Sequence, residues 1–389
     1  MKTFLLLITV LTVLNDTFSE IEQPKLVDKH ANAETQNLYQ NLKSLAGNKT
    51  LFGHQNTNIY GVKWRNKENF SDVFDITGSF PAVYGYDFWH IETEASGVEP
   101  VDYSFDDYVR WTKWAIAKGS LVTFSWHQFN PVTKKSFYDL TPAMSSILPG
   151  GSNHEMYKAQ LDLLAEFFHQ IAPHPIIFRP YHEHNGDWFW WGKGVCKEED
   201  YIQIWRFMVN YLKDEKKVHN LLYAFSPDRS RIDLEKGFED YFYGYPGDDY
   251  VDIFGLDNYW DVGHPQNEDP VEINQERFIT SLEALVDLAN QHGKIAALTE
   301  TGIEGQRDPK WWTRRLLAGL NHSPKTKQIL WVLVWRNANE QHDKKNHFYA
   351  PHKRHPAADD FIKFRKNERI LFEGDYTGIY SKDSLVLEK

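Results

Sequence analysis

Short apolar runs recur along the chain and alternate with longer segments in which apolar residues repeat at helical spacing. Each run is about strand length and apolar on both faces, which is typical of a parallel strand covered by helices. The eight predicted strands are residues 50–53, 81–86, 121–126, 176–180, 221–225, 251–256, 295–299 and 329–335. The predicted helices between them are residues 105–118, 156–171, 200–213, 275–292 and 311–320.

Eight such units in sequence predict an α/β fold, a (β/α)₈ TIM barrel. An open doubly wound sheet is the alternative, but that fold normally carries a glycine-rich turn after its first strand. Here the first strand is followed by His54-Gln55-Asn56-Thr57, so the barrel is favoured. We expect one catalytic domain over residues 20–389, with residues 365–389 packed as an extension of it.

Two of the apolar runs end abruptly on a glutamate. Glu183 follows the fourth predicted strand and precedes a cluster of aromatic residues, whereas Glu300 follows the seventh. In a barrel of this kind the residues beyond the carboxyl ends of the strands form the active site. The two glutamates are therefore expected to face one another across that end of the barrel.

Paired carboxylates beside aromatic surfaces are what hydrolysis of a sugar–sugar bond requires. One carboxyl acts as a proton donor and needs a raised pKa, which apolar rings and a neighbouring carboxylate can supply. The other stays ionised through hydrogen bonds, for which Tyr259 and Arg336 are candidates. A lone glutamate at a strand end is more often half of a surface ion pair, whereas two glutamates on suitable strands favour a catalytic pair.

Aromatic residues make up 15% of the chain and include 14 tryptophans. Some must be core, but their concentration near strand ends also suggests a surface that stacks on flat ligands. Strand-like alternation would turn Trp188 and Trp190 one way and Trp191 the other. The net charge of −11 disfavours nucleic acid or an anionic membrane as a partner.

Residues 1–19 have the pattern of a secretory signal peptide, with Lys2 before an apolar stretch and small residues near the expected cleavage point. We therefore expect a secreted, extracellular protein, and a monomer. Cys196 is the single cysteine, which excludes an internal disulfide. A domain of this size can bury enough surface to fold without one.

Metal chemistry is a competing interpretation, because His182-Glu183-His184 resembles a ligand cluster. The zinc-protease motif places its second histidine three residues after the glutamate and on a helix, whereas His184 is adjacent and follows a strand. The sequence also lacks the nucleophile elbow of the esterases. We expect neither a metal nor another cofactor.

The longest strand-end motif lies around Glu183 and resembles that of a known enzyme family. Arg179-Pro180-Tyr181-His182-Glu183, followed by Gly186, Trp188 and Trp190-Trp191-Gly192, resembles glycoside hydrolase family 26, best known for endo-β-1,4-mannanases. Supporting matches between residues 50 and 340 are Phe52-Gly53-His54-Gln55, Ser125-Trp126-His127, Gly255-Leu256-Asp257-Asn258-Tyr259, Leu298-Thr299-Glu300-Thr301-Gly302 and Trp335-Arg336-Asn337.

The resemblance implies a retaining, double-displacement reaction with Glu183 as acid/base and Glu300 as nucleophile. It also implies supporting roles around them: His182 beside the acid/base, Trp188 and Trp335 as sugar platforms, Tyr259 bonded to the nucleophile, and Asp257, His127 and Arg336 lining the cleft.

The leading hypothesis is a secreted endo-β-1,4-mannanase acting on mannan, glucomannan or galactomannan. The same two glutamates could instead act on mixed-linkage β-1,3-1,4-glucan or β-1,3-xylan. A non-catalytic carbohydrate-binding protein on a degenerate barrel and a metal-dependent hydrolase remain further alternatives.

Overall fold

Eight parallel strands pair side by side and close into a barrel in the computed structural model, which describes residues 25–88, 103–337 and 347–389. The barrel strands are β1 (Thr50–Gln55), β4 (Val83–Asp87), β5 (Leu121–Trp126), β6 (Ile176–Pro180), β7 (Leu221–Phe225), β8 (Ile253–Asn258), β9 (Ile295–Thr301) and β10 (Trp331–Val334). Closure comes from β1 and β10, whose register pairs Leu51 with Trp331. The predicted (β/α)₈ barrel is confirmed.

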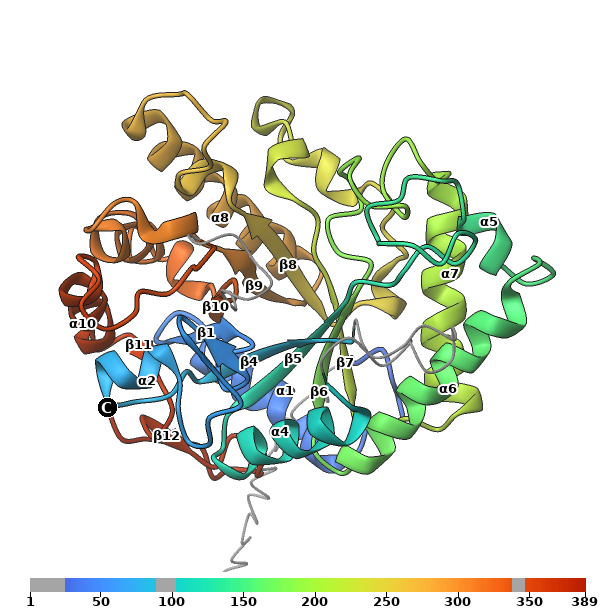
Figure 1. The fold of residues 1–389 in the computed structure, drawn as a ribbon, viewed down its shortest axis with the longest axis horizontal. Helices are drawn as coiled ribbons and strands as arrows, with labels where there is room; N and C mark the ends of the chain where they lie inside the picture. The colour runs from blue at the N-terminus through green and yellow to red at the C-terminus, as the bar shows by residue number, and fades with distance from the viewer. Residues whose placement is uncertain (1–24, 89–102, 338–346) are drawn as a thin grey trace, which may run out of the picture.

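Helices surround the strands, as Figure 1 shows. The long ones are α4 (Phe105–Ala117), α6 (His154–Ile171), α7 (Glu198–Asn210) and α8 (Val271–Gln291), and shorter ones are α2 (Asp72–Thr77), α5 (Met144–Ile147), α9 (Ala318–Leu320) and α10 (Ala358–Lys366). A π-helical turn, Tyr211–Glu215, extends α7, and another, Trp312–Leu317, precedes α9. Within the described residues, no helix is long and apolar enough to cross a membrane.

Strand and helix boundaries differ from the prediction mainly at polar residues. Strand β8 runs on through Asp257 and Asn258, which were expected to follow it. Both buried side chains are satisfied by hydrogen bonds, Asp257 from Arg179 and Asn258 to Asp261. Helix α7 begins at Glu198 rather than residue 200, since acidic residues are favourable in a first turn but invisible to apolar periodicity.

Helix α1 (Ala33–Leu45) was not predicted, and it closes the amino-terminal end of the barrel. Its Leu38, Leu42 and Leu45 join one apolar cluster with inward-facing strand residues such as Leu222 and Trp331. A second cluster fills the layer between the strands and the outer helices. The amino-terminal end is thereby sealed, and the carboxyl ends of the strands remain open for a site.

The carboxyl-terminal segment packs against the barrel, as expected of an extension. Strand β11 (Ile370–Leu371) pairs with the start of β1, and Phe372 is fully buried against Phe52. The remaining short strands form two ribbons, β2 (Tyr60–Gly61) with β3 (Trp64–Arg65) and β12 (Tyr376–Thr377) with β13 (Val386–Leu387). The predicted signal peptide, residues 1–19, lies outside the described residues.

Candidate active site

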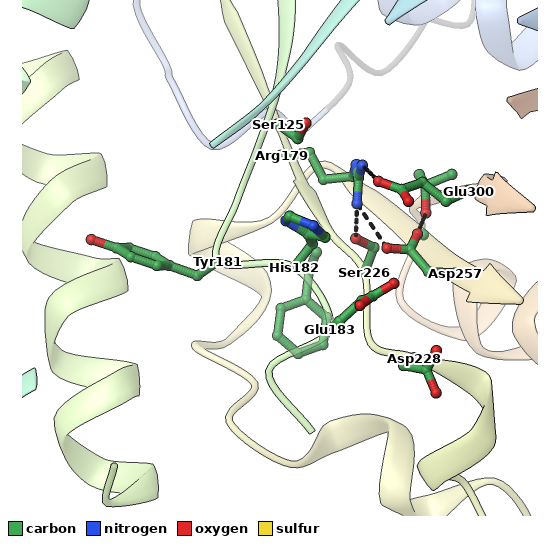
Figure 2. Close-up of polar contacts among 12 residues, drawn as sticks. Ser125, Arg179, Tyr181, His182, Glu183, Ser226, Asp228, Asp257 and Glu300 are labelled. Carbon is green, nitrogen blue, oxygen red and sulfur yellow. Dashed lines mark hydrogen bonds and ion pairs between the residues drawn. The ribbon is translucent and has the colours of Figure 1, made fainter. Parts of the chain in front are cut away.

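Glu183 and Glu300 meet at the carboxyl-terminal end of the barrel. Glu183 follows β6, Glu300 lies on β9, and a carboxylate oxygen of each lies within 4.8 Å of the other. Both line a cleft with a cavity volume of about 680 Å³. Figure 2 shows the two side chains directed toward the same space. The strand assignment therefore brings the two predicted carboxylates together.

The backbone at Glu183 turns sharply out of β6. Tyr181 and Glu183 both have positive φ angles, 47° and 54°, which are uncommon for residues with side chains and often mark functional sites. The Glu183 amide donates to the carbonyl of Ser226 at 2.8 Å, which ties the turn to the end of β7. The Tyr181 hydroxyl points away from the cleft and donates to Gln128.

Arg179 supplies the positive charge beneath the site. It is buried on β6 and donates hydrogen bonds to Oδ2 of Asp257 at 2.8 Å and to the Ser226 hydroxyl at 3.1 Å. It also donates to Oε1 of Glu300. Burying a guanidinium requires such partners, because its transfer out of water is otherwise very unfavourable. No separate role was predicted for Arg179, which was named only as part of the motif that ends at Glu183. An arginine inside an apolar strand nevertheless indicates a buried ion pair.

Glu300 accepts a hydrogen bond at each carboxylate oxygen. Arg179 donates to Oε1, and the Tyr259 hydroxyl donates to Oε2 at 2.9 Å. Donors on both oxygens favour the ionised form, which is the form that can attack a carbon atom. The predicted contact between Tyr259 and this carboxylate is present, whereas the cation is Arg179 rather than Arg336.

Glu183 lies in the opposite electrostatic environment. Burial raises its pKa well above the usual range, and the nearby carboxylates of Asp228, Asp257 and Glu300 raise it further. One hydrogen bond works against them, from Nε1 of Trp188 to Oε2 at 2.8 Å. Glu183 is therefore suited to hold a proton.

Two histidines form the wall beside Glu183. Nδ1 of His127 lies 2.6 Å from Oδ2 of Asp87, and the His182 ring packs edge-on against His127 at 4.5 Å. Burial alone would raise the pKa of Asp87, but His127 and the Ser125 hydroxyl outweigh it and lower that pKa to about 2. Burial and Arg179 hold the pKa of His182 well below its usual value, so this ring is neutral.

The other sequence-predicted residues divide into two groups. The cleft is lined by His127, His182, Trp188, Tyr259 and Trp335. The expectation that Asp257 lines it is wrong, because Asp257 is fully buried and pairs with Arg179. Arg336 also lies outside the cleft lining, and its guanidinium is 5.9 Å from the centre of the Tyr60 ring.

The tryptophan cluster departs from strand-like alternation because it lies in a turn. Trp188 reaches the cleft, but Trp190 is fully buried and donates to the carbonyl of Gln128 at 2.8 Å. Trp191 is also buried and donates to the carbonyl of His182 at 2.9 Å. The prediction that Trp188 and Trp190 face the same way is wrong. Both buried rings support the acid-bearing turn instead.

Loop residues that sequence reasoning did not select complete the cleft. They include Tyr138, Asp228, Arg231, His264, Glu304 and Tyr349. Tyr138 stacks on Phe189 with ring centres 5.5 Å apart and remains 60% exposed. Periodicity does not locate such residues, because they lie in loops whose conformation is set by tertiary contacts.

Three carboxylates in the site lie close enough together to be considered as metal ligands. Among the described residues, Glu183, Asp257 and Glu300 are the one group of three potential ligands clustered within 4.8 Å. The guanidinium of Arg179 already pairs with two of the three. His184 turns away, with Nε2 2.6 Å from the carbonyl of Tyr243. The donor set fits a carboxylate pair organised by arginine.

The chain matches a known family along most of its length. The family model described as Glycosyl hydrolase family 26 covers residues 27–349. The chain belongs to glycosyl hydrolase family 26. The resemblance inferred from the motifs is thereby confirmed.

Relatives within family 26 include two bacterial enzymes. The chain is 33% identical over 329 residues to a mannan endo-1,4-beta-mannosidase from Bifidobacterium adolescentis, covering 80% of this chain and 32% of that protein. It is 31% identical over 278 residues to a mannan endo-1,4-beta-mannosidase from Bacillus subtilis, covering 67% of each. The chain thus spans only about a third of the length of the Bifidobacterium protein.

Solved structures of family 26 proteins share the fold over nearly their whole length. A GH26 beta-mannanase from Bacteroides ovatus aligns with a TM-score of 0.80 and 35% identity, covering 90% of this chain and 98% of that one. GH26C from a Muricauda species aligns with a TM-score of 0.81 and 33% identity, covering 92% and 97%.

Proposed function

We propose that this family 26 chain is an endo-β-1,4-mannanase that hydrolyses mannan, glucomannan or galactomannan with retention of anomeric configuration. The observation that carries the proposal is the pairing of two unequal carboxylates within 4.8 Å. Retaining glycosidases hold their carboxyl groups about 5–5.5 Å apart, whereas inverting enzymes need about 6.5–9.5 Å to admit a water molecule. The relatives named as mannan endo-1,4-beta-mannosidases support the substrate class.

The proposed reaction has two displacements. The Glu300 carboxylate attacks the anomeric carbon while Glu183 gives its proton to the departing glycosidic oxygen, which leaves a glycosyl ester on Glu300. Glu183, now ionised, takes a proton from water as that water attacks the same carbon and releases Glu300. The two inversions give net retention. Both roles are supplied by side chains, so the proposed reaction needs no cofactor.

The rest of the cleft is assigned to substrate binding. The partly exposed Trp188 and Trp335 line the cavity and can stack on pyranose rings. His127 and the neutral His182 border the same space and can exchange hydrogen bonds with sugar hydroxyls.

We further propose that the protein is secreted, which the leader-like residues 1–19 support, and that it acts as a monomer. The net charge of −11 argues against nucleic acid or anionic membranes as partners.

The test is reducing-sugar release by purified residues 20–389 from galactomannan, glucomannan, mixed-linkage β-glucan and β-1,3-xylan. We expect release from the mannans, lowered about 10²–10⁴-fold in Glu183→Gln, with Glu300→Gln inactive because it lacks a nucleophile. Glu155→Gln is the control, because that side chain is 84% exposed on α6.

Other outcomes would favour other functions. Release from β-glucan or β-1,3-xylan alone would keep the two glutamates and reject mannan as the substrate. Mannan binding by folded protein without any product would indicate a carbohydrate-binding protein. Loss of activity with a chelator would indicate metal-dependent hydrolysis.

A further inference from the structure

Asp228 faces Glu183 but was not selected by any motif. It follows β7, lines the cleft and is only 7% exposed. In Figure 2 the Glu183 carboxylate lies between those of Asp257 and Asp228. The two loops are tied together, because the Asn185 side chain exchanges two hydrogen bonds of 2.7 Å with the backbone of Asp228. The separation of the two carboxylates is therefore fixed by the fold.

A short 3₁₀ turn, Arg229–Arg231, holds Asp228 in this place. The Ser230 amide donates to Oδ1 of Asp228 at 2.7 Å, and the Ser230 hydroxyl donates to the same oxygen. Nε of Arg229 pairs with Asp261 at 2.9 Å beneath the turn. Arg231 reaches over the Trp188 ring at 5.3 Å and pairs with Asp187 at 2.7 Å. Each end of the turn is thus anchored by an arginine.

The cations and histidines around Glu183 and Asp228 form their ion pairs and hydrogen bonds with other groups. Arg179 pairs with Asp257 and Glu300, and Arg229 and Arg231 pair with Asp261 and Asp187. His127 pairs with Asp87, and burial keeps His182 neutral. The Tyr259 hydroxyl has a raised pKa, through burial and nearby carboxylates, and carries no charge. Among the described residues, none forms an ion pair with Asp228 within 4.0 Å.

Asp228 and Glu183 differ in the pKa values of their carboxyl groups. Burial raises the pKa of Asp228 to about 6, so that it is charged above that pH. The hydrogen bonds from Ser230 and the nearby charges of Arg231 and Arg229 lower this pKa, but burial outweighs them. The pKa of Glu183 is raised by burial first and by Asp228 next, ahead of Asp257 and Glu300. Asp257 and Glu300 share the compensating charge of Arg179, whereas Asp228 does not.

We propose that Asp228 is a positioning residue for the proton of Glu183: its carboxylate, fixed opposite the acid by the Arg229–Arg231 turn, disfavours the ionised form of Glu183 and sets the alkaline limit of hydrolysis. This role rests on the proposed function of Glu183 as general acid. Asp228 transfers no proton itself. It keeps the proton on Glu183 until the leaving oxygen takes it.

The test is the pH dependence of kcat/KM of Asp228→Asn on a manno-oligosaccharide. Asparagine keeps the cap acceptor for Ser230 and removes the charge. Removing that charge stabilises the Glu183 carboxylate and lowers its pKa, so the alkaline limb moves to lower pH. We expect a shift on the order of one pH unit. An alkaline limb that coincides with that of the parent enzyme, whether or not overall activity falls, would overturn the proposal.

Matched controls separate charge from structure. Asp233→Asn removes a carboxylate that caps the neighbouring turn, Leu234–Lys236, outside the cleft lining, and should leave the limb in place. Asp228→Ser gives a second uncharged cap, and its limb should move as in Asp228→Asn. On a dinitrophenyl β-mannobioside, whose leaving group needs no proton, Asp228→Asn and the parent should share one alkaline profile.

A measurement without substrate distinguishes this proposal from the proposed function. Carbon-13 NMR can follow the Glu183 carboxyl, assigned by its loss in Glu183→Gln, through a pH titration of the free protein. Its midpoint should fall in Asp228→Asn even if the chain hydrolyses no mannan. An unchanged midpoint would overturn the role of Asp228 independently of any activity.

Discussion

At the residue scale, one buried cation determines how the site is charged. Arg179 pairs with both Asp257 and Glu300, but its single positive charge cannot balance two carboxylates, so Glu183 lies beside uncompensated negative charge. Two glutamates of the same intrinsic acidity are thereby driven to different states by their surroundings. The chemistry is a property of the arrangement of charges and not of either glutamate alone.

Tyr259 gives the first residue-scale prediction. Its hydroxyl donates to Glu300 at 2.9 Å, and hydrogen bonds to charged groups contribute about 1.5–3 kcal/mol. If Tyr259→Phe loses that contribution in the transition state, kcat should fall about 10–150-fold. The measurement is steady-state kinetics on a manno-oligosaccharide, with the melting temperature recorded alongside.

A remote tyrosine serves as the control. Tyr376 is buried and donates to the carbonyl of Ala82, far from the cleft lining. Tyr376→Phe should lower stability by about 1 kcal/mol and leave kcat unchanged. Equal kcat in Tyr259→Phe and the parent would contradict the role assigned to the hydroxyl.

The sequence predicted the glutamates but not the groups that tune them. Glu183 lies just beyond β6, after Tyr181 and His182, and Glu300 lies within β9, so barrel geometry alone places them at the same end. Asp228 and Arg231 belong to an irregular loop, and their positions depend on contacts with Asn185 and Trp188. No periodic pattern encodes contacts of that kind.

At the element scale, the alternation of strands and helices was predictable because buried parallel strands are apolar on both faces. Helices α1 and α10 escaped prediction, because polar and charged residues outnumber the apolar ones in both. Their buried residues nonetheless pack against the barrel, Leu42 at its amino-terminal end and Phe361 against Phe52 on the outside of β1. A sparse apolar face gives a weaker periodic signal than a continuous apolar run.

The carboxyl-terminal segment should contribute strongly to stability. Phe372 is fully buried and stacks on Phe52 of β1 with ring centres 4.7 Å apart. Removing a buried aromatic side chain costs about 3–5 kcal/mol, so Phe372→Ala should lower the free energy of unfolding by that amount. Urea unfolding followed by tryptophan fluorescence measures it.

Leu387 lies in the same segment but is 41% exposed, so Leu387→Ala should change stability by no more than about 0.5 kcal/mol. If both variants unfolded at the same urea concentration as the parent, the segment would not be part of the barrel's cooperative core.

At the scale of the whole molecule, the aromatic content serves two purposes. Much of it is core. Among the residues that the structure describes, seven tryptophans are fully buried: Trp126, Trp190, Trp191, Trp205, Trp311, Trp312 and Trp331. Others, including Trp188, Trp260 and Trp335, line the cleft. Composition could predict the abundance of rings but not this division, because each ring's place depends on the packing of distant elements.

The barrel also explains how residues so far apart in sequence can act together. Glu183, Asp228 and Glu300 follow or belong to β6, β7 and β9, whose carboxyl ends open at the same face. Helix α1 closes the opposite end with an apolar cluster. The fold thereby supplies a frame that brings the three carboxylates to one cleft.

The measurement that tests the central claim most directly is the anomeric configuration of the first product. Proton NMR during hydrolysis of a β-manno-oligosaccharide distinguishes the two anomers before they equilibrate. A carboxylate pair within 4.8 Å predicts that the β-anomer appears first and the α-anomer follows by mutarotation. If the α-anomer appeared first, hydrolysis would proceed by a single inversion, and Glu300 could not be the nucleophile.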